Sequence, residues 1–198
     1  MVRKALWLWV FFASIPSWVF AMEPEFSADM TLRAAGQVMT GKVYCKRGKV
    51  RCEIAQAISI VRMDKKISYT LMPAEKIYMQ QPADGVPLAK IGSVEQSELE
   101  RVAIGLETIG GRRAVKSRVR YADSKGSPVD VYLWLDYLGI PLKVQALDES
   151  WGVEYSNIDN SIPPSDDLFE IPADYQLFVM PDVSQMGDFQ QQAKGSHQ

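Results

Sequence analysis

The chain has 198 residues, with 22 lysines and arginines against 24 aspartates and glutamates, 47% hydrophobic residues and two cysteines. This length suits one domain with a real core, and the near-neutral balance argues against a nucleic-acid binder held by its overall field. The single histidine is His197, next to the last residue, so the usual general base and metal ligand is almost absent. We therefore expect no enzymatic activity, no metal site, no cofactor and no nucleic-acid partner.

The first 21 residues are typical of a secretory signal peptide. Arg3 and Lys4 precede an apolar run over residues 5–21 that contains Pro16 and ends in Ala21. This pattern predicts export with cleavage after Ala21. The alternative is an uncleaved membrane anchor, although a run of 17 residues is marginal for crossing a bilayer.

Removal of residues 1–21 leaves a chain with a net charge of −4. No second stretch of this chain approaches 18 apolar residues, so we predict no transmembrane segment after signal removal. The expected location is the periplasm or the exterior of the cell.

From Phe26 onward, apolar and polar residues alternate with a period of two, as in strands that bury one face. The first half predicts an antiparallel meander with strands at 28–33, 37–45, 50–55, 58–63, 67–72 and 76–80.

An irregular bridge over 82–100 follows, in which residues 93–96 form a capping-box pattern for a short helix. The second half predicts strands at 101–109, 112–121, 129–136, 140–147 and 151–159 and a helical turn at 166–169. Residues 183–198 are rich in Gln and Gly and are expected to be disordered. The fold class is therefore mainly β: residues 22–182 form a single domain with a curled antiparallel sheet and one or two short helices.

Three groups of short motifs carry a family resemblance. They are FSADM at 26–30 with GKVY at 41–44, G-x-E-x-I-G-G at 105–111, and VEYSNI at 153–158 followed by LFEIPADY at 168–175. In this order they resemble a bacterial family of exported proteins of unassigned function, which looks like a distant relative of LolA and other outer-membrane lipoprotein-sorting proteins. The resemblance implies a half-barrel sheet with an apolar concavity, which LolA uses to hold lipoprotein acyl chains.

These observations predict an exported, non-catalytic binding protein that holds a lipid or a lipoprotein acyl chain in the cell envelope. The expected apolar lining consists of Met30, Leu32, Leu71, Leu133, Leu135, Leu142 and Val144. The alternative is a structural or interaction protein with a filled core, which docks an envelope protein through a sheet edge or a basic strand.

One expected strand concentrates positive charge. Lys116, Arg118 and Arg120 alternate and therefore share a face. They could contact anionic lipid headgroups or an acidic partner, or they could form an ordinary solvated sheet face.

Cys45 and Cys52 flank a turn in the first half. If Gly48 and Lys49 form the turn, the two cysteines face each other on neighbouring strands, and an exported protein meets an oxidising compartment. This predicts a disulfide between Cys45 and Cys52, with two thiols as the alternative.

Other chemical motifs are weak. The glycines at 105–111 lack the Lys-Ser/Thr of a phosphate loop, and no G-x-S-x-G motif supports a serine nucleophile. Nine methionines could bind copper(I), but their spacing follows the strands and favours a role in filling apolar space.

Overall fold

The computed structural model describes residues 24–83, 98–122 and 126–179. The predicted signal peptide, capping box and disordered tail lie outside these residues. In the described part, every regular element is a strand or a short 3-10 turn, and no helix is long and apolar enough to cross a membrane.

The element boundaries follow the predicted alternation closely. The strands are β1 (Phe26–Ala34), β2 (Gln37–Lys46), β3 (Lys49–Ile54), β4 (Ala57–Arg62), β5 (Ile67–Met72), β6 (Ile77–Pro82), β7 (Glu98–Ile109), β8 (Arg112–Ala122), β9 (Pro128–Leu135), β10 (Pro141–Ala146), β11 (Trp151–Asp159) and β12 (Gln176–Leu177). The 3-10 turns are η1 (Met63–Lys65) and η4 (Asp166–Phe169). The predicted fold class, mainly β with a curled antiparallel sheet, is confirmed.

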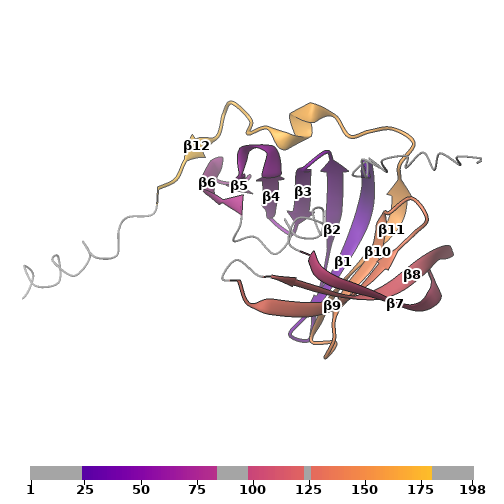
Figure 1. Ribbon diagram of the computed structural model, residues 1–198. Helices are drawn as coiled ribbons and strands as arrows, with labels where there is room; N and C mark the ends of the chain where they lie inside the picture. The colour runs from indigo at the N-terminus through magenta and orange to yellow at the C-terminus, as the bar shows by residue number, and fades with distance from the viewer. Residues whose placement is uncertain (1–23, 84–97, 123–125, 180–198) are drawn as a thin grey trace, which may run out of the picture.

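All twelve strands belong to one sheet, in the order β12-β6-β5-β4-β3-β2-β1-β11-β10-β9-β8-β7. It consists of two meanders, β1–β6 and β7–β11, which are joined by antiparallel pairing of β1 with β11. Only the two-residue strand β12 is parallel to its neighbour, β6, among the described strands. Figure 1 shows that the sheet is curled, with β7, β8 and β9 crossing at a steep angle to β1–β6.

Cross-strand register assigns side chains to two faces of the sheet. The face that carries Met30 includes Leu32, which lies opposite Val153, and Val144, which lies opposite Val153 and Leu133; we call it the Met30 face. The other face carries Trp134, which lies opposite Lys116 and Lys143, and we call it the Trp134 face.

Gly41 in β2 lies where neighbouring backbone leaves no room for a side chain. A Cβ atom at this position would lie 2.0 Å from the Glu53 carbonyl oxygen in β3. A backbone atom cannot move aside as the end of a flexible side chain can, so the strands would have to separate.

We therefore expect Gly41→Ala to lower the free energy of unfolding by about 1–3 kcal/mol, the usual cost of overpacking. Gly105→Ala is the matched control, because Gly105 also lies in a strand but has no atom within 4 Å of the added Cβ. Urea denaturation of both variants measures the difference; equal stabilities would contradict the predicted clash.

Residues 160–179, which we call the strap, run from the end of β11 across the Trp134 face of the first meander (Figure 1). Phe169 is fully buried there and packs in a cluster with Ile60 and Leu71. Beyond it, the backbone N–H groups of Gln176 and Phe178 donate to the carbonyl oxygens of Lys76, which directly precedes β6, and Tyr78 in β6. The strap thus covers one face of the meander and extends its edge.

Ion pairs hold the strap on both sides of Phe169. Asp166 accepts hydrogen bonds from Lys49 Nζ at 2.7 Å and Lys46 Nζ at 3.0 Å. Glu170 pairs with the buried Arg62 guanidinium. The two lysines beside Asp166 lower the pKa of its carboxyl group from 3.8 to about 2.

This shift predicts an acid dependence of stability. Because the pKa of Asp166 is depressed in the folded state, its contribution is present above pH 3.8 and is lost as the pH falls toward 2. Asp166→Asn should lower the urea unfolding midpoint relative to the wild type above about pH 5, and the difference should shrink as the pH approaches 2.

Asp167→Asn is the control, since no ion pair joins Asp167 to another described residue; it should leave the midpoint near that of the wild type. A difference between Asp166→Asn and the wild type that stays constant over the whole pH range would contradict the ion pairs.

Candidate functional site

An apolar surface with a buried floor and a partly exposed rim lies on the Met30 face of the second meander. The floor consists of Val119, Val131, Leu133 and Val144, each at most 5% exposed. Around it pack the partly buried side chains of Tyr121, Val129, Leu135 and Trp151. We call these eight residues the apolar platform.

The platform forms because four adjacent strands present their apolar positions to the same face. Val119 lies opposite Val131, and Leu133 lies between Ser117 and Val144. β-Branched and aliphatic side chains on neighbouring strands pack against each other at these pairs. The result is an apolar surface that is bordered on the side of β7 by the charged residues Glu98 and Arg101.

The platform continues into the first meander through β1. Leu32 lies opposite Val153 of β11 on one side and Met39 of β2 on the other. Leu32 and Met39 are both partly exposed, whereas Val153 is buried. One line of apolar side chains therefore crosses five strands, from Met39 through Leu32, Val153 and Val144 to Leu133.

Most of the lining residues predicted from the sequence lie on this face. Leu133, Leu135 and Val144 belong to the platform, Leu32 extends it, and Met30 is buried in the adjoining cluster. That these residues contact a ligand stays a prediction.

Leu71 and Leu142 lie on the Trp134 face instead. Leu71 packs under the strap with Phe169. Leu142 sits at an irregularity between Pro141 and Lys143, and it packs with Trp134 and Ala114. Neither residue lies with the other five. Alternation within a strand does not say which of its faces matches a given face of a distant strand, and a bulge moves the side chains that follow it to the opposite face.

The three basic residues predicted to share a face do so, but each is paired with an acid. Lys116 Nζ lies 3.2 Å from Glu107, and Arg118 and Arg120 each lie 3.0 Å from Asp130. These contacts lower the pKa of Asp130, mainly through Arg120 and then Arg118. The strand is thus less positive than its sequence indicates, and its contact with an anionic group stays a prediction.

Trp134 is the centre of this basic surface, which the sequence did not reveal. Lys116 Nζ and Lys143 Nζ lie 4.9 Å and 4.8 Å from its ring, and its indole N–H donates to Glu107 at 2.7 Å. The indole and Lys116 together lower the pKa of Glu107. Trp134 is only 2% exposed. Its ring is therefore covered by neighbouring side chains and is not accessible to a ligand.

The disulfide prediction rests on a register that is wrong. The two-residue turn consists of Arg47 and Gly48, both with positive φ, so Lys46 lies opposite Lys49. Cys45 then lies opposite Val50 and Cys52 opposite Val43. The two buried cysteines are diagonal neighbours, and no disulfide joins them. Burial raises the pKa of the Cys52 thiol to about 12, so it is protonated at neutral pH.

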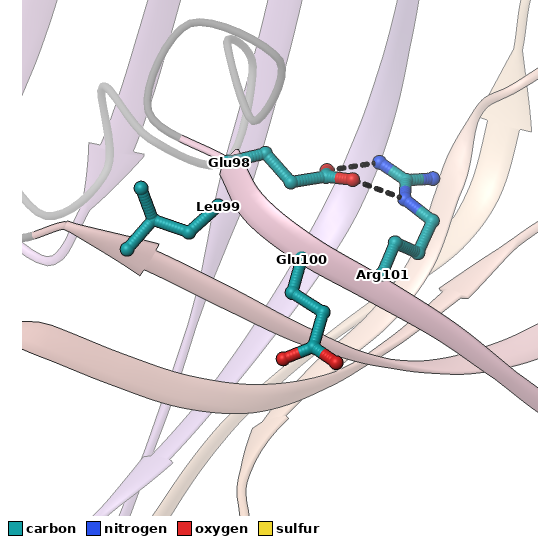
Figure 2. A pocket seen from close by; sticks show the side chains of 4 residues that line it. All are labelled: Glu98, Leu99, Glu100 and Arg101. Atoms are coloured by element: carbon teal, nitrogen blue, oxygen red, sulfur yellow. Dashed lines mark hydrogen bonds and ion pairs between the residues drawn. The ribbon is translucent and has the colours of Figure 1, made fainter.

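A hollow of about 480 Å³ lies at the start of β7, at the edge of the platform, because Glu98 lies opposite Tyr121 and Arg101 lies opposite Val119. Figure 2 shows its lining residues, Glu98, Leu99, Glu100 and Arg101, with Glu98 and Arg101 paired to each other. The ion pair of Glu98 with Arg101 therefore borders the apolar platform on the side of β7. Among the residues that the structure describes, no three His, Cys, Asp or Glu side chains converge to hold a metal ion.

No family model matches the chain, and no curated protein is significantly similar to it. Solved structures show distant likenesses. The MucA/MucB complex of Pseudomonas aeruginosa matches 81% of this chain at 17% identity, with a TM-score of 0.49. The lipoprotein LppX of Mycobacterium tuberculosis matches 74% at 13% identity, with a TM-score of 0.44.

A LolA superfamily protein of Nitrosomonas europaea matches 75% of the chain at 10% identity, with a TM-score of 0.39. The alignments cover 92% of LppX and 90% of the LolA superfamily protein, whereas the chain spans only 60% of the P. aeruginosa chain that it matches. The resemblance to LolA-type proteins that the motifs predicted is thus found again as a distant structural likeness.

Proposed function

We propose that this protein is an exported, non-catalytic binding protein of the cell envelope that holds an apolar chain against the platform. The observation that supports this is the continuous apolar line from β2 to β9, with a buried floor and an exposed rim. The ligand class is a lipid or the acyl part of a lipoprotein.

Burial of apolar surface supplies the free energy of such binding. Burial of a methylene group removes apolar surface from water and stabilises a complex by about 0.8 kcal/mol. An acyl chain lying over this line contacts the partly exposed Met39 and Leu32 and the rim of the platform, and so gains affinity without a directed hydrogen bond. The rim aromatics Tyr121 and Trp151 add contact surface while keeping their polar atoms near water.

Tryptophan fluorescence gives a direct test. With residues 1–21 removed, the chain contains two tryptophans, Trp134 and Trp151. Trp151 lies on the platform rim, whereas Trp134 is buried on the opposite face. A brominated fatty acid should therefore quench Trp151, and Trp151→Phe should abolish the quenching.

A pair of neighbouring residues tests the binding face. Met39 and Val38 are adjacent in β2 but point to opposite faces, and both reach solvent. Met39→Ser should weaken binding of the brominated fatty acid about tenfold, the loss expected for one large apolar contact, and Val38→Ser should leave it unchanged. Equal effects of the two substitutions, or no quenching of the wild type, would contradict the proposal.

The second candidate function is docking of an envelope protein at the sheet edge, and β7 favours it. Four large apolar side chains of this edge strand are at least 50% exposed: Leu99, Val102, Ile104 and Leu106. Among the described strands, β7 pairs with β8 alone. An exposed edge of this kind offers unpaired backbone groups and apolar contacts to an added strand.

Site-specific crosslinking distinguishes this candidate. A photo-crosslinking amino acid at Val102 should give one discrete protein adduct in the cells that make the protein, whereas the same probe at Val38, which is also more than half exposed, should give none. No adduct at Val102, or the same adducts at both positions, would contradict docking at β7.

A further inference from the structure

Two neighbouring hairpins end at the same side of the molecule and expose apolar side chains there. The β7–β8 turn leads into Arg112, and the β9–β10 turn follows Leu135, which lies opposite Val115 of β8. Figure 1 shows both turns at one side of the curled sheet. We call residues 105–116 and 134–143 together the hairpin end.

Exposure at the hairpin end concentrates in large apolar residues. Tyr137 is 89% exposed and Leu138 is 45% exposed at the β9–β10 turn. Leu106 and Val115, which are paired on β7 and β8, are 65% and 41% exposed. An aromatic ring and aliphatic side chains in one exposed patch are typical of a surface that meets another apolar phase.

The turn that carries Tyr137 is held rigidly from beneath. The side chain of Asp136 is only 1% exposed. One of its carboxylate oxygens accepts hydrogen bonds at 2.9 Å from the backbone N–H groups of Leu138 and Ile140. The other accepts a bond at 2.6 Å from Arg112. Tyr137 and Leu138 are therefore presented outward at little further cost in conformational entropy.

Charge at the hairpin end differs in sign from that of the whole chain. Its 22 residues contain four basic and two acidic side chains, whereas the chain has a net charge of −2. Arg113 is exposed, and no ion pair joins it to another residue of the described ranges. Its neighbour Arg112 bonds to Asp136, the residue before Tyr137, so Arg113 belongs to the same end of the sheet as the β9–β10 turn.

We propose that the hairpin end docks on an anionic lipid surface. Tyr137 and Leu138 enter the interface between headgroups and acyl chains, where an aromatic ring with a polar hydroxyl is favoured. Arg113, which has no ion pair among the described residues, attracts the anionic headgroups. The basic strand Lys116-Arg118-Arg120, of which Lys116 is part of the hairpin end, adds little to this attraction because its charges are compensated by Glu107 and Asp130.

This proposal does not depend on the proposed apolar ligand, because vesicle binding is measured in the absence of that ligand. Leu135 nevertheless links the two surfaces, since it belongs to the platform rim and pairs with Val115 of the hairpin end. A chain docked in this way would hold the rim of its platform close to the lipid surface.

Vesicle flotation with the protein lacking residues 1–21 tests the proposal. We expect it to bind phosphatidylcholine vesicles that contain phosphatidylglycerol and to bind vesicles of phosphatidylcholine alone much more weakly. The double substitution Tyr137→Ser with Leu138→Ser should reduce the partition coefficient at least about tenfold, and Arg113→Gln should reduce it about fivefold.

Val38→Ser is the control, because Val38 is 57% exposed but lies beside the β1–β2 turn at the opposite end of the sheet. It should bind like the wild type. Absence of binding to anionic vesicles, equal binding to both kinds of vesicle, or unchanged binding of the double variant would each overturn the proposal. Quenching by the brominated fatty acid in the same variants reports separately on the platform.

Discussion

The pairing of β1 with β11 is the contact on which the rest of the structure depends. Within each meander, every strand pairs with its neighbour in the sequence, and the pairing of β1 with β11 joins the two meanders. It places Leu32 opposite Val153 and Met30 opposite Tyr155. The rings of Phe26 and Tyr155 meet edge to face across this seam at 6.4 Å. A slip of one residue would turn every apolar side chain of β1 to the other face, so this register decides whether the apolar line exists.

The strands could be read from the sequence because each buries one face, and turns interrupt the alternation at every hairpin. The relation between strands could not be read so well. A turn placed one residue too late put Cys45 opposite Cys52, and the irregularity at Leu142 moved that side chain to the Trp134 face. Alternation is a property of one strand, whereas a shared face depends on every register and bulge between the strands compared.

In the candidate site, too, the pattern within one strand predicts some features, whereas others depend on contacts with distant strands. Five of the seven expected lining residues lie on the Met30 face, because they are the apolar positions of well-patterned strands. The partners of Lys116, Arg118 and Arg120 come from β7 and β9, and no pattern within β8 predicts them. Exposure of Tyr137 likewise follows from the turn that Asp136 fixes, so an apolar residue there reaches solvent rather than the core.

The roles proposed for the platform, the hairpin end and the open edge of β7 all depend on apolar contact. Native mass spectrometry of the protein purified from the envelope of the cells that make it tests the central claim, the binding of an apolar chain, most directly. We expect the wild type to carry a bound species with the mass of a lipid or an acylated protein and Met39→Ser to carry less of it. A wild-type spectrum containing the bare chain alone would contradict the claim.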